Sequence, residues 1–376
     1  MRVGFPPSEW YVMPLRKVGE IMRQIDHWVV CAAAVFAFTA FNQAFAEDAT
    51  VIIGGELEFD FVDTENDPTV GEPDPHFVVD QLFLRHKVKF NENVTLFSEI
   101  DIKPGEAKME QVWGKISGLP FHSWVEAGLN RLFIAKMNRK TENRILSEMA
   151  LYRKEDVGIT FGGEPTEQFY WKASLTNGFK LGAISPSEDL ATSSVQLLSD
   201  VRNPANAPKR LMAGLGAGLK LRHGESARLD LLPFFYTGKL SSQDMAVLKI
   251  SGNGGEAVDN KIRYGLNAQY DLGEFTLIGQ FIKAKDGIVD RVGWFIQPSM
   301  RVAHLEFVYR YNDLDVDLTK SFGDGRTWDR EQQVFAVITD LYPRVKIKTE
   351  YAVNSEDTGG RALNNNEFLM ELEMTF

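Results

Sequence analysis

The last nine residues of the chain, 368–376, alternate between apolar side chains and a second set that includes Glu371 and Glu373. Successive side chains of a strand point to opposite faces, so this segment predicts a strand with one apolar face and one charged face. Such a strand suits an outer-membrane β-barrel, in which one face meets lipid and the other a wet lumen. The terminal Phe376 completes a pattern like the insertion signal that barrel-assembly machinery reads. The alternative is an amphipathic edge strand of a soluble sheet.

The other end of the chain has the features of an export signal. Residues 29–40 form an apolar run that Arg23 precedes and Ala44-Phe45-Ala46 follows. A charged start, a short hydrophobic core and an A-x-A site are typical of a secretory signal peptide. The run is shorter than the ~20 residues of a membrane-spanning helix. We therefore predict a signal over residues 1–46, cleaved after Ala46, and a single barrel domain over residues 47–376 in the outer membrane of a Gram-negative bacterium.

Two details of the amino terminus refine this prediction. An internal Met22 would leave a signal of ordinary length, so residues 1–21 are either an extended leader or a mis-assigned start. The only cysteine, Cys31, lies inside the predicted signal. We therefore expect no disulfide and no cysteine-ligated metal in the mature protein.

Alternating segments separated by turn residues continue through the mature chain and predict an all-β, transmembrane antiparallel barrel of about sixteen strands, with fourteen or eighteen as alternatives. Short connections rich in Gly, Pro, Asn and Asp alternate with longer polar ones, as periplasmic turns and external loops do. The predicted strands are 50–62, 76–90, 93–102, 108–117, 122–132, 155–163, 167–177, 210–223, 226–238, 259–271, 274–284, 291–299, 304–313, 329–339, 344–354 and 365–376. The turn near residues 301–303 has no strong turn residue.

Charge and residue usage exclude several classes of function. Residues 1–46 hold four basic and three acidic residues, so residues 47–376 carry 37 basic and 49 acidic residues, a net charge of −12. A chain this acidic is a poor ligand for nucleic acid. The five histidines of residues 47–376 are scattered, and no Ser/His/Asp set or metal-ligand spacing stands out. We therefore expect no enzyme, no cofactor and no metal site.

The predicted strand count constrains function, because a barrel of about sixteen strands encloses an aqueous channel. The leading hypothesis is a porin that allows passive diffusion of small hydrophilic solutes and ions, with anion preference. The alternative is a structural sheath or receptor whose barrel holds a partner protein. Outer-membrane lipid and lipopolysaccharide are the expected surroundings in either case.

Charged residues on one parity of the strands are candidates for the lumen wall. The first and last strands must pair to close the barrel, so their acidic residues should share one wall, with basic rows on the flanking strands. The alternative is a structural charge ladder that fixes the strand register and has no ligand. The lumen-lining candidates are Glu56, Glu58, Arg85, Lys87, Lys89, Glu371 and Glu373, and the fifteenth strand adds Lys346 and Lys348.

The third external loop, residues 132–154, is the sharpest candidate for a pore constriction. From Arg131 to Lys154 it has seven basic residues against Glu142 and Glu148, a net +5. Such a loop would favour anions if it narrowed the pore, and residues 141–151 are expected to form a short amphipathic helix that docks it inside. The alternative is a solvated loop that attracts lipopolysaccharide. The constriction candidates are Arg131, Lys136, Arg139, Lys140, Arg144 and Arg153.

Several segments resemble the phosphate-selective porins of the O and P type. They are residues 83–88, 124–136, 139–153, 156–163 and the aromatic segment 169–178 that ends in Asn-Gly. The resemblance is clearest over about 80–180, and it implies a sixteen-stranded, typically trimeric channel. Family members usually have a Lys-x-Pro element at the start of the loop, whereas Met137 and Asn138 follow Lys136 here. Phosphate selectivity therefore does not follow from the resemblance.

The signal-peptide assignment predicts where the mature protein begins. We expect protein from outer-membrane fractions to start at Glu47, because signal peptidase recognises the small residues Ala44 and Ala46 and cleaves after the second of them. Intact-mass and amino-terminal peptide mass spectrometry measure this. Retention of residues 1–46 in an inner-membrane protein would contradict the assignment.

Overall fold

The computed structural model of the 376-residue chain describes residues 49–64, 75–136, 140–184, 197–201, 210–224, 226–245, 259–287, 289–317, 329–357 and 366–376. The predicted signal peptide and its cleavage site lie outside these residues.

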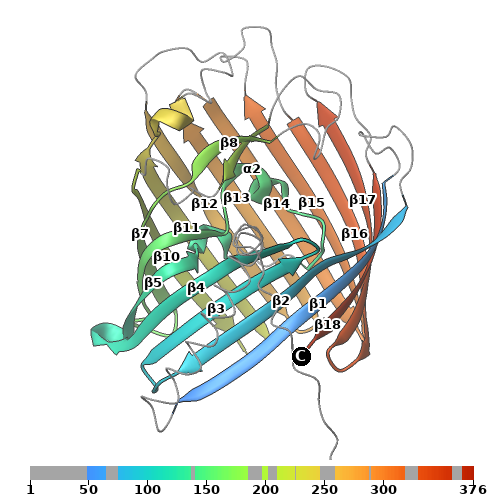
Figure 1. The fold of residues 1–376 in the computed structure, drawn as a ribbon, viewed down its shortest axis with the longest axis horizontal. Coiled ribbons are helices and arrows are strands. Elements are labelled where there is room, and N and C mark those ends of the chain that lie inside the picture. Colours follow the sequence, from blue (N-terminus) through green and yellow to red (C-terminus); the bar gives the residue numbers. More distant parts are fainter. Residues whose placement is uncertain are drawn as a thin grey trace, which may run out of the picture. The chain divides into compact units, whose positions relative to one another are not determined.

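Sixteen antiparallel strands form one closed barrel, in which each strand pairs with its neighbour in the chain and the last pairs with the first (Figure 1). This confirms the predicted fold class and strand count. The strands are β1 (Thr50–Thr64), β2 (His76–Lys89), β3 (Val94–Lys103), β4 (Glu106–Leu119), β5 (Ser123–Arg131), β6 (Glu155–Gly163), β7 (Phe169–Thr176), β10 (Met212–His223), β11 (Ala227–Lys239), β12 (Asn260–Leu272), β13 (Phe275–Asp286), β14 (Val289–Val302), β15 (Leu305–Asp317), β16 (Asp329–Tyr342), β17 (Val345–Asp357) and β18 (Glu367–Thr375).

One predicted turn is shifted. Residues 301 and 302 belong to β14, and the connection to β15 is the two-residue turn Ala303–His304. Ala303 has a φ of 56°, and a positive φ at the first central residue is typical of two-residue hairpin turns, where glycine usually provides it. Because a non-glycine residue fills this position, composition gave no turn signal at residue 303.

The alternation of side chains gives the barrel an apolar outer face. Leu215 of β10 is 62% exposed and Phe335 of β16 is 50% exposed, although both are large and apolar. On the opposite parity, polar side chains such as Asn267 and Gln280 are buried inside the barrel. A lipid-facing surface and a polar interior are the division that a membrane-spanning barrel needs.

The barrel closes through β1 and β18. Their register places Leu57 opposite Met374 and Glu58 opposite Glu373, so apolar pairs face outward and acidic pairs inward. Phe376 extends the ladder, because its backbone N–H and carbonyl each make a 3.0 Å hydrogen bond with Gly55. A Cβ on Gly55 would overlap the Phe376 ring and lie 2.6 Å from the backbone carbonyl oxygen of Phe83, so the close packing of β1 against its neighbours requires glycine there.

The longer connections contain structure of their own. Strands β8 (Lys180–Ile184) and β9 (Leu197–Val201) form a separate two-stranded sheet within the connection from β7 to β10, which sequence analysis did not predict. Short 3₁₀ segments occupy η1 (Pro120–His122) and η2 (Phe133–Ala135). The predicted helix over 141–151 is shorter in the structure, α2 (Leu146–Leu151), because side chains of the barrel wall bind the backbone of residues 142–144.

Among the described residues, we find no helix with the length and apolar character needed to cross a membrane.

The two faces of β18 should respond differently to the same charge. Met370 faces outward in the middle of the strand, opposite Phe61, and a lysine at the bilayer midplane costs about 2–4 kcal/mol. We expect Met370→Lys to lower the yield of folded barrel in lipid vesicles, measured by heat-modifiable migration and urea titration. The control is Thr375→Lys on the inward parity, opposite Glu56. Equal yields for the two variants would contradict the assigned faces.

Candidate functional site: the loop inside the barrel

The loop from β5 to β6 folds onto the inner wall of the barrel. Its apolar residues, among them Phe133, Ile134 and Leu151, belong to one buried cluster with inward-facing residues of β11, β13 and β15. The Phe133 ring stacks on Tyr236 of β11 with 4.7 Å between centroids. Burying a side chain of this size stabilises by roughly 1.5–3 kcal/mol, so the apolar strip on the wall holds the loop in place. In Figure 1, α2 lies against β14 and β15, in agreement with its contacts.

Two buried arginines hold the carboxyl end of α2. Arg263 of β12 donates from Nε to the Leu151 carbonyl at 2.9 Å, and Arg291 of β14 donates to the Ala150 carbonyl. Asp286 joins the two guanidinium groups, with Oδ1 3.0 Å from Arg263 Nη1 and Oδ2 bonded to Arg291. The two arginines are fully buried, and buried charges require partners of this kind. Positive charge at a helix carboxyl end also complements the helix dipole.

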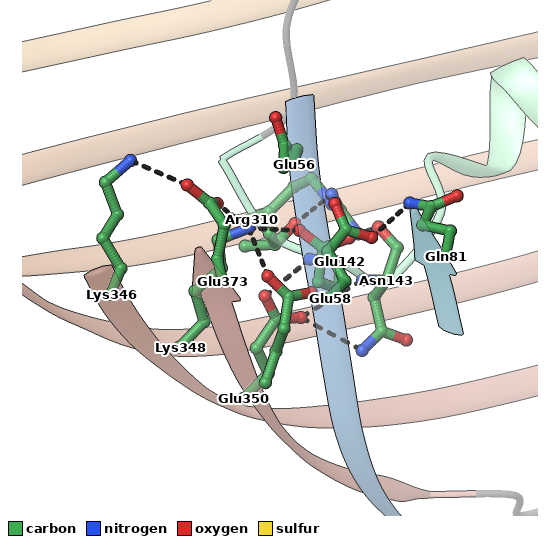
Figure 2. Close-up of polar contacts among 12 residues, drawn as sticks. Glu56, Glu58, Gln81, Glu142, Asn143, Arg310, Lys346, Lys348, Glu350 and Glu373 are labelled. Atoms are coloured by element: carbon green, nitrogen blue, oxygen red, sulfur yellow. Dashed lines mark hydrogen bonds and ion pairs between the residues drawn. The ribbon is translucent and has the colours of Figure 1, made fainter. Parts of the chain in front are cut away.

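A second set of polar contacts holds the loop segment that precedes α2 (Figure 2). Arg310 of β15 donates to Thr141 and, at 2.6 Å, to the Asn143 carbonyl. Glu350 of β17 accepts the backbone N–H of Glu142 at 2.6 Å and that of Asn143 at 3.2 Å. Side chains of the wall thus satisfy backbone groups that would otherwise form the first turn of a helix.

Two of the predicted constriction residues form ion pairs with the wall. Lys136 Nζ lies 2.6 Å from Asp230 Oδ1 and 4.7 Å from the centroid of the Tyr170 ring. Lys140 Nζ donates to Ser299 at 2.8 Å and pairs with Glu306. Burial lowers the pKa of Lys136, and the ion pair with Asp230 opposes that shift. Part of the positive charge of the loop is therefore neutralised locally.

The other predicted constriction residues are distributed differently. Arg144 is exposed, and within the described part of the chain its guanidinium has no ion-pair partner. Arg153 is half-buried with Nε buried. Arg131 ends β5, with Nε 3.9 Å from Glu155 Oε1, and its parity is that of the outward-facing Ala127. Arg139 lies outside the described residues. Because Arg131 has the outward parity, it is not part of the proposed constriction.

The acidic residues of the closing strands are bound to basic neighbours. Arg85 of β2 lies 2.9 Å from Glu56 and 2.6 Å from Glu99. The pairing of β1 with β18 forms the closing seam of the barrel. On the β18 side of this seam, Lys346 Nζ lies 3.2 Å from Glu373 Oε1. On this wall the acidic residues of β1 and β18 thus lie between basic residues of the flanking strands β2 and β17.

Three more lysines on the strands that flank the seam differ in their contacts. Lys348 contacts both Glu371, at 2.7 Å, and Glu373, at 2.8 Å. Lys87 is half-buried opposite Phe97, and Lys89 is exposed at the end of β2; neither forms an ion pair among residues that the structure describes.

Sequence analysis missed the residues that position the loop, namely Arg263, Arg291 and Arg310. Each occupies an inward parity of its strand, in β12, β14 and β15 respectively. A row of arginines on three nearby strands, all on the inward parity, is the signal that would have indicated a docked loop opposite them.

The chain has no match among protein-family models and none among curated proteins, but solved structures resemble it. OmpF of Salmonella typhi, in a complex with daunomycin, is 11% identical with a TM-score of 0.62 and covers 87% of this chain and 97% of that one. OmpT of Vibrio cholerae, in a trimer form, is 12% identical with a TM-score of 0.58, over 88% and 100%. An anion-selective porin from Comamonas acidovorans is 11% identical with a TM-score of 0.57, over 88% and 100%.

At these identities the likeness establishes the fold, which is the closed sixteen-stranded barrel of outer-membrane porins. The similar structures are outer-membrane proteins of several kinds, one of them an anion-selective porin, and they do not single out the phosphate-selective type that residues 80–180 resemble.

Asp286 is the residue on which the docking of α2 depends most. We expect Asp286→Asn to remove the carboxylate that bridges the two buried arginines, at a cost of about 3–5 kcal/mol. The loop should then open to trypsin at Arg144, Arg153 or Lys154, which limited digestion and peptide mass spectrometry would detect.

The control for this experiment is Asp340→Asn. Asp340 pairs with Arg301 at 2.7 Å, but both side chains are at least one-third exposed, so the loss should be about 0–1 kcal/mol. Equal protection of the loop in the Asp286 and Asp340 variants would mean that the buried triad does not hold α2.

Proposed function

We propose that this protein is an outer-membrane porin, a water-filled channel for passive diffusion of small hydrophilic solutes and ions with a preference for anions. The observation that carries the proposal is a closed sixteen-stranded barrel with an apolar outer face and a loop fastened to its inner wall. A barrel of this size encloses more space than the wall side chains fill, and a loop on the inner wall would narrow that space.

The proposed anion preference rests on the charges that the loop brings to the lumen. Lys136 and Lys140 reach wall carboxylates, and Arg144 stays exposed without an ion-pair partner in the described residues. Positive groups at a narrow point lower the entry barrier for anions. The likeness to an anion-selective porin agrees with this direction.

Assembly and surroundings follow from the same proposal. The apolar outer face would contact outer-membrane lipid and lipopolysaccharide, and the strand that ends in Phe376 would be the signal for the barrel-assembly machinery. A homotrimer is the proposed oligomer, in keeping with the trimer form of OmpT from Vibrio cholerae. A channel of this kind needs no catalytic group, and we assign none.

The second candidate, a sheath or receptor around a partner protein, differs in what occupies the lumen. An open porin conducts ions in a planar bilayer as purified protein, whereas a sheath conducts only after its partner is removed. Single-channel recording on the purified barrel therefore separates the two functions, and a purified barrel without conductance would contradict the porin proposal.

Removing positive charge from the loop should change the selectivity of the channel. We expect the combined variant Lys136→Gln, Lys140→Gln and Arg144→Gln, with Arg139→Gln added, to shift the reversal potential toward cations. Glu306 and Asp230 would then lose their lysine partners and keep only the more distant arginines as ion-pair partners, Arg301 at 3.3 Å and Arg228 at 3.8 Å. At ~0.15 M salt the screening length is about 8 Å, so only charges near the narrow point have this effect.

The measurement is the reversal potential across a tenfold salt gradient. The control variant changes Lys239, Lys283 and Lys285 to Gln, because all three occupy the outward parity of β11 and β13. A loop variant that keeps the reversal potential of the parent would place the selectivity determinants elsewhere in the lumen.

A further inference from the structure

Aromatic rings and lysine ammonium groups are paired on the inner wall of β4, β5, β7 and β10. Lys115 Nζ of β4 lies 4.2 Å from the centroid of the Trp124 ring of β5. The Tyr170 ring of β7 has two ammonium groups over it, Lys136 of the loop at 4.7 Å and Lys220 of β10 at 4.9 Å. The four strands lie on one side of the barrel (Figure 1). The negative face of each ring thus attracts and positions a cation.

Inward-facing glycines let two of these rings lie against the backbone of the wall. A Cβ on Gly162 of β6 would lie 2.3 Å from Cζ2 of Trp124. A Cβ on Gly218 of β10 would lie 1.9 Å from Cζ of Tyr170. A side chain at either position would push the ring off the wall, since glycine marks places where another group approaches the backbone closely. The two glycines therefore hold each ring against the wall as a broad apolar surface between charged side chains.

Two lysines of this wall have no carboxylate partner. Glu126 lies opposite Lys115 in the β4–β5 register, but among the residues that the structure describes the two form no ion pair. Lys172 of β7 lies opposite Gly162 on one side and Gly216 on the other, and in the same part of the chain it forms no ion pair. The charge of both lysines is therefore available to an anion in the lumen.

A second pair of rings and further lysines extend the same wall. The Phe97 ring of β3 stacks on Trp113 of β4 with 5.0 Å between centroids, and Lys87 of β2 lies opposite Phe97. Lys220 pairs with Glu164 at 3.0 Å, but the Glu164 side chain is 55% exposed. An exposed ion pair is weak, so an anion can displace it. Apolar ring surface thus lies next to ammonium groups along several strands of the wall.

We propose that this ring–lysine wall, defined by Trp124, Tyr170, Lys115, Lys172 and Lys220, binds organic anions that carry a carboxylate on a flat aromatic ring. The carboxylate would bind to the ammonium groups and the ring would stack on Trp124 or Tyr170, an arrangement that adds attraction beyond the burial of apolar area. Ligand sites commonly combine aromatic surface with a few charged groups in this way. This inference rests on the proposed function, because it names a class of solute for the channel.

The spacing of the wall suits a small aromatic acid. Trp124 and Lys172 are two strands apart, and neighbouring strands are about 4.8 Å apart, so their backbones are separated by about 10 Å. The flexible four-carbon stem of Lys172 covers roughly half of this distance. One aromatic ring with one carboxylate fits the remainder. An inorganic anion would contact the lysines and leave the rings without a partner.

The test measures binding of benzoate to the folded, full-length barrel in detergent by saturation-transfer NMR. Competition with acetate and with inorganic phosphate gives the affinities of these two anions. We expect benzoate to bind with a Kd on the order of 1 mM, as suits a ligand of few atoms. Because the rings contribute to its binding, benzoate should bind at least about tenfold more tightly than acetate or phosphate. Equal affinity for the three anions would show that charge alone binds them and would overturn the proposal.

Variants separate the contribution of the ring from that of the charge. Trp124→Leu should weaken benzoate binding about three- to tenfold, as expected for the loss of one aromatic pair, and leave acetate binding unchanged. Lys115→Gln and Lys172→Gln should weaken the binding of both anions at least about threefold, because an ammonium group is lost. The matched control is Trp171→Leu, since the Trp171 ring also lies against a glycine, Gly163, but on the outward parity. This control should bind benzoate like the parent.

The outcomes separate this inference from the proposed function, because binding in detergent does not require conduction. A barrel that binds benzoate as expected but does not conduct would contradict the porin and support the ring–lysine wall. A conducting barrel whose benzoate affinity is the same in the parent and in Trp124→Leu would overturn the wall and leave the porin standing. If Trp124→Leu does not fold, unchanged benzoate affinity in both Lys115→Gln and Lys172→Gln would overturn the proposal.

Discussion

Every backbone N–H and C=O group of a chain in hydrocarbon must find a partner within the protein, and a closed sheet is the only arrangement of strands that provides one for each. In this protein the pairing of β1 with β18 meets this requirement, because without it the edges of both strands would be exposed to lipid with unpaired backbone groups. Phe376 and Gly55 exchange backbone hydrogen bonds at the end of that seam. The apolar outer face and the polar inner face then follow from the alternation of side chains along each strand.

Closure of the barrel also brings acidic side chains of β1 and β18 close together in the interior. The register that aligns apolar residues outside places Asp60 opposite Glu371 and Glu58 opposite Glu373 inside, and like charges directly opposite each other destabilise a sheet. Arg85, Lys346 and Lys348 on the flanking strands offset part of this charge. The loop brings Glu142 to the same place, where Lys348 pairs with it at 2.6 Å.

The docking of the loop combines apolar burial with buried charge. An apolar strip of the inner wall receives Phe133, Ile134 and Leu151, while Arg263, Arg291 and Arg310 bind backbone carbonyls of the loop. Apolar contacts supply attraction without direction, whereas hydrogen bonds from fixed guanidinium groups set one orientation. These contacts fix one orientation of α2 and the segment before it, which a selective constriction would require.

The sequence alone determined the class of fold, because a period of two residues and the spacing of turn residues are local properties of the chain. Sixteen strands, the pairing of the first with the last, and the inward parity of Glu58 and Glu371 could all be predicted in this way. Local signals also have limits, as the turn at Ala303 shows, where the left-handed conformation is adopted by a residue with no special preference for it.

Only the tertiary structure decided how the loop folds and which charges meet. Residues 141–145 lack a helix because Arg310 and Glu350, about 170 and 210 positions away in the chain, bind their backbone. Lys136 pairs with Asp230 and Lys140 pairs with Glu306. Part of the net positive charge of the loop is therefore neutralised by carboxylates of the barrel wall. Glu58, Glu142 and Glu371 likewise meet only in the closed barrel. Closing the sheet brings together side chains that are far apart in the chain, and a local pattern holds no information on such distances.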